Sequence, residues 1–421
     1  MKQVTIAVIT PSIFFIRVFF QFVKVCPDLC LPPDCILGTF RTIESTMRHQ
    51  NLPPTARPAW SVIDLDALAH NVRVIRRMLR PTDRFYAVCK NNAYGCGTQE
   101  TARTIVDAGA DAFAVSDPED AERIRAAGIT APILLYASTC PNMADAVTEL
   151  GLIATVHDFD GLDALARVRR LVDVHVEVDC GYGRLGFTPD AWADVFKRLR
   201  QVSNMRVVGL YTHLTLVESA AAIRQQGELF QRAAAAAQDA GLQNLELMAA
   251  SSRVMLGYPE LNLNAVNPGR MLYGMIEDPW QNKADLRPVI KAIKSRVLQV
   301  KTIPAYFEMN TPRHLTKPGS LRTAVISFGF KDGLPREPAG GTVLIRGQRA
   351  SIIGMRATEH TIVDVTDIPG VCAGDEVVIV GAQGADAISG HEAVSMYRMA
   401  MIELLPRMTL NTIRLYEGST A

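Results

Sequence analysis

The chain has 421 residues, of which 48% are hydrophobic and 21% charged, and this is enough apolar material for two domains. Its 44 Lys and Arg residues nearly balance its 43 Asp and Glu residues, so no overall field favours nucleic acid or an acidic membrane surface. The eight cysteines are scattered, which excludes a disulfide framework, and we expect them to be reduced. Cys26, Cys30 and Cys35 surround a Pro-rich run without a nearby fourth ligand, so we expect no metal site.

The N-terminal stretch differs in composition from the rest of the chain. Residues 4–23 are strongly apolar, and three interpretations are open: a signal-like segment, a membrane anchor, or upstream sequence from a wrongly assigned start, with Met47 opening the protein. Arg17 argues against an anchor, because an arginine near the middle of a span costs about 2.5–3.5 kcal/mol. We favour the wrongly assigned start, because a coherent domain pattern begins only at Arg57.

A regular alternation of helical and β-type runs follows. An amphipathic helix is predicted over residues 62–79. Further helical runs include residues 101–110, 120–129, 163–172 and 220–241. The predicted strands are residues 85–90, 112–116, 132–138, 152–158, 172–179, 207–213, 246–251 and 264–274. Eight such units are typical of a β/α barrel, and the absence of a Gly-x-Gly-x-x-Gly motif after the first strand makes a doubly wound open sheet the weaker alternative.

After about residue 290 the pattern changes to strands without long helices, broken by Gly and Pro turns. The predicted strands are residues 295–303, 322–330, 341–355, 360–367 and 375–382, and a short helical or loop region over residues 391–405 precedes a last strand. The sequence therefore predicts an α/β fold in three parts: an N-terminal extension over residues 1–56, a TIM-type β/α barrel over residues 57–289 and a mainly β domain over residues 290–421.

Polar residues at the ends of the predicted barrel strands are the candidates for an active site, because the loops that follow the strands build it. They are Lys90, Glu177, Arg184, His213, Ser251, Ser252 and residues 267–270. Desolvation lowers the pKa of a lysine at a strand end, which suits Lys90 to a Schiff base unless its charged end reaches solvent from the rim. Ser252 and Gly269 follow strands where barrels bind phosphate, and together these features indicate an aldehyde cofactor that bears a phosphate. The alternatives are a structural histidine at His213 and a surface ion pair at Arg184.

Seven segments match one known family in order and spacing. They are RPAWSVIDLDALAHNVRVIR, AVCKNNAYGCG, VEVDCGYGRLGF, GLYTHL, NPGRMLYG, FGFKDGLPR and MYRMAMIELLPR. Through them, residues 57 to about 405 resemble the alanine racemases, which are fold type III pyridoxal 5'-phosphate (PLP) enzymes with an N-terminal β/α barrel and a C-terminal β domain. The resemblance implies PLP as the cofactor and a homodimer with shared active sites.

The resemblance also implies roles for individual residues. It implies that Lys90 forms the Schiff base with the cofactor and serves as one catalytic base. It places Arg184 against the phenolic oxygen of the cofactor and the substrate, and His213 beneath the pyridine ring. The residues implied to bind the cofactor phosphate are Tyr94, Ser252, Gly269, Arg270 and Tyr397.

Several positions depart from the family pattern. Asn267 stands where the family has an arginine that contacts the pyridine nitrogen, and it can donate a hydrogen bond but carries no charge. Glu177 stands where many members have a lysine that is often carbamylated. A lysine carbamate and a glutamate are both anions, so Arg184 still has an anionic neighbour. Thr358 and Glu359 replace a Met-Asp pair that faces the substrate carboxylate, and we expect them to bind substrate.

The second catalytic base of the family is a tyrosine contributed across the dimer interface. Counting back nineteen residues from Phe330, which replaces the entrance tyrosine of the family, gives Thr311. A threonine hydroxyl is too weak an acid or base unaided, so Tyr306, His314 or a water molecule is the alternative. With Thr311 at this position, Lys90 is the one conventional catalytic base that the sequence predicts.

The sequence predicts an isomerase: a PLP-dependent racemase of alanine-racemase type that acts on alanine or a related small amino acid. The alternatives are a one-base PLP enzyme of the same fold, such as an amino-acid aldolase or decarboxylase, and a catalytically silent PLP-binding protein. We expect a cytoplasmic protein without nucleic-acid or membrane partners, although the apolar N-terminal segment leaves export or anchoring open.

Overall fold

The computed structural model describes residues 57–136, 143–307 and 319–418, all within one unit of the chain, residues 54–421. The apolar segment 4–23, Met47 and the three cysteines near residue 30 lie outside the described residues, so the predictions made for them stay predictions. In the described part of the chain no helix has the length and hydropathy that a membrane span needs. In this part Cys89, Cys96 and Cys180 are free thiols.

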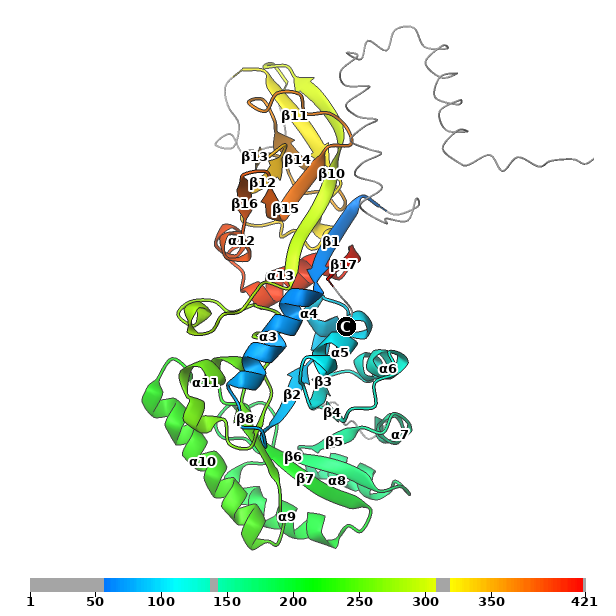
Figure 1. Cartoon of the computed structure of the whole chain (residues 1–421), viewed down its shortest axis with the longest axis vertical. Helices are drawn as coiled ribbons and strands as arrows, with labels where there is room; N and C mark the ends of the chain where they lie inside the picture. Colours follow the sequence, from blue (N-terminus) through cyan, green and yellow to red (C-terminus); the bar gives the residue numbers. More distant parts are fainter. Residues whose placement is uncertain (1–56, 137–142, 308–318, 419–421) are drawn as a thin grey trace, which may run out of the picture. The chain divides into compact units, whose positions relative to one another are not determined.

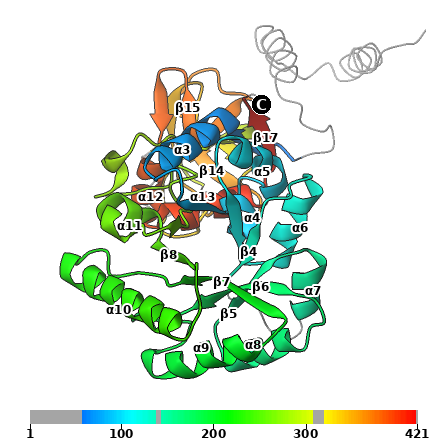
Figure 2. The same cartoon turned by 60° about the horizontal axis from the view of Figure 1, so that its bottom comes forward.

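Eight parallel strands close a barrel, which confirms the prediction (Figures 1 and 2). They are β2 (Arg84–Val88), β3 (Ala112–Val115), β4 (Ile133–Leu135), β5 (Ile153–Val156), β6 (Val172–Glu177), β7 (Met205–Tyr211), β8 (Glu246–Ala250) and β9 (Ala265–Val266). Each strand pairs with the next, and β9 pairs back with β2. Most of the strand residues are buried, because side chains fill the barrel and helices cover it.

Helices connect the barrel strands, and Figure 2 shows α6 to α10 on the outside of the barrel. The helices are α3 (Leu65–Arg77), α4 (Lys90–Tyr94), α5 (Thr98–Asp107), α6 (Pro118–Ala126), α7 (Ala144–Glu149), α8 (Phe159–Ala166), α9 (Trp192–Gln201), α10 (Ala220–Asp239) and α11 (Ser252–Gly257). In α9 the buried residues Trp192, Val195, Phe196 and Leu199 recur at helical spacing. This apolar stripe holds the helix against the barrel.

The first predicted helix was wrong over its first three residues, because the chain forms a strand there. This strand, β1 (Ala59–Asp64), pairs antiparallel with β10 (Ile290–Ile303) and parallel with β17 (Ile413–Glu417). The helix begins after Asp64, whose side chain accepts the Ala67 N–H at 2.8 Å and so caps it. Apolar residues before Asp64 belong to the sheet, and those after it belong to the helix.

The remaining strands form a mainly β domain, as predicted (Figure 1). They are β11 (Leu321–Ile326), β12 (Thr342–Ile345), β13 (Gln348–Ile352), β14 (Thr361–Asp364), β15 (Glu376–Gln383) and β16 (Asp386–Ile388). Strands β10, β11, β14, β13, β12 and β15 form a ring of pairings, because β15 also pairs with β10. Helices α12 (Gly390–Tyr397) and α13 (Met401–Thr409) precede β17.

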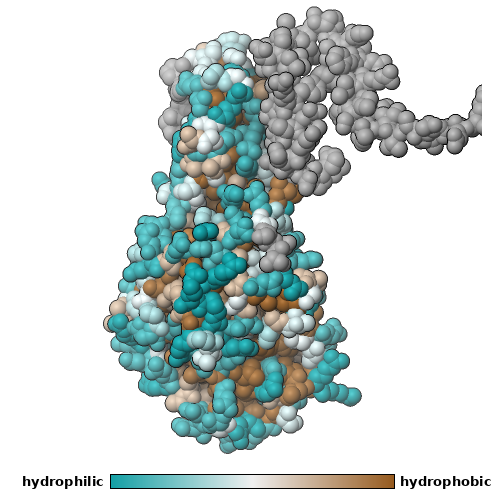
Figure 3. All heavy atoms as spheres, viewed as in Figure 1, coloured by the Kyte–Doolittle hydropathy of each residue, from teal (hydrophilic) through white to brown (hydrophobic). Residues whose placement is uncertain are grey.

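Large apolar side chains lie inside the described part of the chain. Trp60, Phe113 and Phe328 have no exposed surface. The face drawn in Figure 3 is mostly hydrophilic, with smaller apolar areas among the polar side chains. Burial of this apolar surface is the main force that holds the barrel and the β domain in their folded form.

Candidate active site

Side chains that follow the barrel strands converge on one cavity of about 550 Å³, a size suited to a small organic molecule. Eight residues that the sequence predicted to bind cofactor or substrate line it: Lys90, Tyr94, Arg184, His213, Ser252, Asn267, Gly269 and Arg270. Glu177 and Ser251, also noted at strand ends, line it as well. Strand-end position was therefore a good guide to the residues that meet here. It missed Tyr136, Tyr182 and Arg253, which also line the cavity.

Lys90 directly follows β2 and Cys89, at the entrance to a strained turn. Burial of its amine lowers its pKa below the ordinary value, and the positive charges of Arg184 and Arg270 lower it further. A lysine with a lowered pKa spends more time as the neutral amine, which is the nucleophilic form. The four residues after it, 91–94, all have positive φ between 51° and 56°.

This left-handed turn costs roughly 1–2 kcal/mol per residue that is not glycine. The surrounding structure holds it in place through side chains. The Asn92 N–H donates to Asp120 at 3.2 Å, and the Asn92 side-chain oxygen accepts the Thr98 N–H at 2.8 Å. Strain kept beside the reactive lysine is typical of a functional loop.

The loops after β8 and β9 form a cradle for an anion. The hydroxyl oxygen of Ser252 accepts the backbone N–H groups of Gly269 at 3.0 Å and Met271 at 3.2 Å. A Cβ atom on Gly269 would lie 2.5 Å from the Tyr94 hydroxyl oxygen, so the backbone and this phenol approach closely only because the residue is glycine. Arg270 adds a guanidinium group to the same cavity wall. The hydroxyl groups and the arginine of this cradle suit a phosphate.

The loop after β6 presents Arg184 and an aromatic residue to the cavity. The Asp179 carboxylate accepts the backbone N–H groups of residues 181–183 at 2.8, 2.8 and 2.9 Å, which fixes the glycine-rich turn. The Arg184 guanidinium lies 4.5 Å from the ring centre of Tyr182, and this ring lies 5.5 Å from the ring of His213. Burial lowers the pKa of His213 to about 4, and Arg184 contributes. His213 is therefore uncharged at neutral pH.

Two hydrogen-bonded pairs form part of the cavity wall. Glu177 is buried and accepts the Tyr211 O–H at 2.9 Å. Burial raises the pKa of Glu177, and the nearby charge of Arg184 opposes that rise. The side-chain N–H of Asn267 donates to the hydroxyl oxygen of Tyr136 at 2.8 Å.

Among the described residues predicted to act in the site, Tyr397 and Tyr306 do not line the cavity. Tyr397 is buried at the end of α12, where the Arg356 guanidinium lies 5.3 Å from its ring centre. Tyr306 follows β10 and is 87% exposed. Thr311 lies outside the described residues. Their roles stay predictions.

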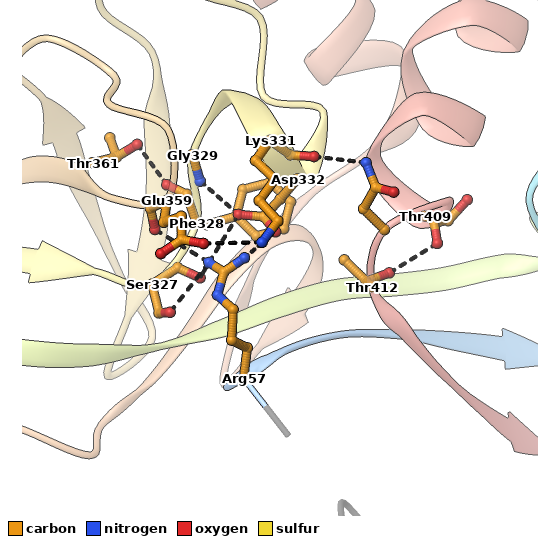
Figure 4. Close-up of polar contacts among 11 residues, drawn as sticks. Arg57, Ser327, Phe328, Gly329, Lys331, Asp332, Glu359, Thr361, Thr409 and Thr412 are labelled. Carbon is orange, nitrogen blue, oxygen red and sulfur yellow. Dashed lines mark hydrogen bonds and ion pairs between the residues drawn. The ribbon is translucent and has the colours of Figure 1, made fainter. Parts of the chain in front are cut away.

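The predicted substrate residues Thr358 and Glu359 lie in the β domain, and Figure 4 shows Glu359 beside Lys331. The Lys331 N–H donates to the Thr358 carbonyl oxygen at 2.9 Å, and the Lys331 amine lies 2.9 Å from the Glu359 carboxylate. Arg57 joins the cluster through a 2.6 Å ion pair with the buried Asp332. Thr358, Glu359 and Phe330 do not line the barrel cavity of their own chain.

The fold and the site define a class of enzyme: a β/α barrel with a lysine of lowered pKa and an anion cradle at the strand ends, followed by a β domain. The family models "Alanine racemase, N-terminal domain" and "Alanine racemase, C-terminal domain" match residues 63–277 and 290–416. The chain therefore belongs to the alanine racemase family, and it is an isomerase of the racemase type.

Individual relatives agree with this assignment. The chain is 33% identical over 386 residues to an alanine racemase of Desulfosudis oleivorans, which covers 86% of this chain and 98% of the relative. It is 34% identical over 355 residues to one of Desulfovibrio desulfuricans, covering 82% and 95%. Among solved structures, alanine racemase from D-cycloserine-producing Streptomyces lavendulae superposes with a TM-score of 0.78 at 28% identity, covering 87% and 98%. The biosynthetic alanine racemase of Pseudomonas aeruginosa gives 0.75 at 28% identity, covering 86% and 100%.

Proposed function

We propose that the chain racemises alanine or a related small amino acid with pyridoxal 5'-phosphate bound in the barrel cavity. One observation carries the proposal. Lys90, Arg184 and the cradle of Ser252, Gly269 and Arg270 reach the same cavity from separate loops. A nucleophilic amine and an anion cradle in one cavity match the aldehyde and the phosphate of this cofactor.

The residues present fit the phosphate, the aldehyde and the phenolic oxygen of the cofactor. The loop of residues 269–271, with Ser252 and Arg270, would hold the phosphate, and the Lys90 amine would hold the aldehyde carbon. Arg184 would face the phenolic oxygen. When bound, the cofactor would withdraw electrons from the substrate Cα and so make its proton removable.

Lys90 would take the Cα proton on its own side of the substrate and return it there, because its lowered pKa favours the neutral amine. Inversion needs a second proton-transfer group on the opposite side. The described segment with Tyr306 does not reach the cavity of its own chain, and neither do Thr358 and Glu359. We therefore propose a homodimer in which the partner's Tyr306 or the partner's Thr311 completes the site.

The test uses the full-length protein with added cofactor and each enantiomer of alanine in deuterated water. Chiral chromatography with mass spectrometry should find both enantiomers and deuterium at Cα. Lys90→Ala should lose both inversion and exchange, because no other amine takes its place. Lys197→Ala is the matched control, since Lys197 is an exposed lysine on α9, and it should behave as the wild type.

The same measurement separates the alternatives. Deuterium exchange without inversion would favour a one-base enzyme over a racemase. Cofactor binding without exchange on any amino acid tested would contradict the proposal and leave a silent cofactor-binding protein.

A further inference from the structure

A hydrogen bond crosses the mouth of the barrel between two residues that no sequence motif relates. Tyr136 follows β4 and Asn267 follows β9, and these strands are separated by β2 and β3 in the closed barrel. The Asn267 side-chain N–H donates to the Tyr136 hydroxyl oxygen at 2.8 Å. Both residues line the cavity, so this pair forms part of its wall.

The barrel holds both ends of the pair in place. The backbone N–H of Tyr136 donates to the Val115 carbonyl oxygen at 2.8 Å, and that of Asn267 donates to the Ala250 carbonyl oxygen at 3.0 Å. The Tyr136 ring also packs edge-on against Tyr211, at 5.5 Å between ring centres. The position of the hydroxyl group is thus set by strands and packing rather than by a mobile loop.

The direction of the bond decides what the tyrosine can do next. A hydroxyl group has one proton to donate, and it can accept hydrogen bonds through its lone pairs. Because the Tyr136 oxygen accepts from Asn267, its own O–H stays available for a further acceptor, and accepting a bond strengthens it as a donor. Burial raises the pKa of Tyr136, so the hydroxyl keeps its proton.

The pair also differs in charge from the arginines of the same cavity wall. Arg184 and Arg270 are cationic groups that suit a phenolate and a phosphate, whereas the Lys90 amine, with its lowered pKa, suits an aldehyde carbon. Tyr136 and Asn267 are neutral. Lys90 follows β2 and residues 269–271 follow β9. A cofactor held at these two places still needs a hydrogen-bond partner for the nitrogen of its pyridine ring. Asn267, one member of the neutral pair, follows the same strand, β9, just before that loop.

We propose that Tyr136, held in place by Asn267, donates the hydrogen bond to the ring nitrogen of the cofactor. This inference rests on the proposed function and deepens it. It moves the role that the sequence predicted for Asn267 to Tyr136, and it makes Asn267 a positioning residue. A neutral phenol donates without transferring its proton, so the ring nitrogen stays unprotonated.

The test compares two ligands: PLP and the analogue that has C–H in place of the ring nitrogen. Their dissociation constants are measured by fluorescence titration of the full-length protein freed of cofactor. The wild type should prefer PLP by about 2- to 10-fold, the usual range for one hydrogen bond. Tyr136→Phe should bind the two ligands equally, because it lacks the hydroxyl group that donates to the ring nitrogen. Asn267→Ala should show a reduced preference, since Tyr136 is no longer held.

Tyr258→Phe is the matched control. Tyr258 is buried, and its O–H donates to the Val217 carbonyl oxygen at 2.9 Å, but it does not line the cavity. This variant should keep the wild-type preference. A Tyr136→Phe protein that also keeps it would overturn the inference while leaving PLP binding intact. A wild type that binds neither ligand would instead overturn the proposed function.

A second measurement needs no variant. NMR of the wild-type protein with cofactor labelled at the ring nitrogen should show an unprotonated nitrogen. A protonated nitrogen would contradict a neutral tyrosine donor.

Discussion

The hydroxyl oxygen of Ser252 accepts the backbone N–H of Gly269 at 3.0 Å and so ties the loop after β8 to the loop after β9. The same oxygen accepts the Met271 N–H at 3.2 Å. Ser252→Ala should therefore leave two buried N–H groups without their partner, at a cost of about 1–3 kcal/mol. Thermal unfolding without cofactor should show a lower Tm, and PLP affinity should fall as well. Ser395→Ala is the control, because the exposed Ser395 bonds only within α12, and its Tm should be unchanged.

The close approach of Gly269 to Tyr94 gives a second prediction. A Cβ at Gly269 would lie 2.5 Å from the Tyr94 hydroxyl, and Tyr94 is buried with its ring 4.9 Å from that of Tyr273. Gly269→Ala should displace the phenol, cost about 1–3 kcal/mol as overpacking does, and weaken PLP binding measured by titration. At Gly390 a Cβ would meet its neighbours at 3.4 Å or more, so Gly390→Ala should bind PLP normally. Equal PLP affinities of Gly269→Ala and Gly390→Ala would contradict a phosphate site at Gly269.

The lowered pKa of His213 predicts how stability varies with pH. Unfolded His213 titrates near 6.5, whereas in the folded protein burial, with Arg184 and Lys90, lowers its pKa to about 4. Between these values the unfolded chain binds more protons, so stability is lost as the pH falls from 6.5 toward 4.

Between neutral pH and about pH 5 the loss from this one group is about 2 kcal/mol. His213→Gln cannot titrate and should lack this part of the pH dependence. Urea unfolding of the cofactor-free protein at the two pH values measures it. An equal loss of unfolding free energy in the wild type and in His213→Gln would show that His213 is not held uncharged.

The ion pair between Arg57 and Asp332 joins the segment before β1 to the loop of Gly329, Lys331 and Asp332 (Figure 4). Asp332 is fully buried and Arg57 is 32% exposed, so Arg57→Ala should cost about 3 kcal/mol, the low end for breaking a buried pair. The exposed pair of Arg206 and Asp173 has a similar separation, also 2.6 Å. Arg206→Ala should therefore cost less than about 1 kcal/mol. Denaturant unfolding compares the two, and equal costs would contradict the importance of burial.

The barrel was predictable because its signal is local. Each strand is a short apolar run with a helical run beside it, and the order of these runs defines the fold. The site was predictable in part for the same reason, because Lys90, His213 and Ser252 stand at strand ends that can be read from the sequence.

Other features depend on contacts between distant residues. Tyr136 and Asn267 are 131 positions apart, and only the closed barrel brings them together. Val62 and Ile63 fit the apolar stripe of the helix that follows, so the sequence could not show that they pair with β10 instead. The pairing partner, rather than the local pattern, decides the structure there.

In the proposed function Lys90 holds the cofactor in the barrel cavity. Borohydride reduction of the PLP-loaded protein, followed by digestion and mass spectrometry, tests this attachment. We expect the cofactor on the peptide that carries Lys90, and none on that peptide in Lys90→Ala. Attachment to another lysine, or no attachment in the wild type, would contradict it.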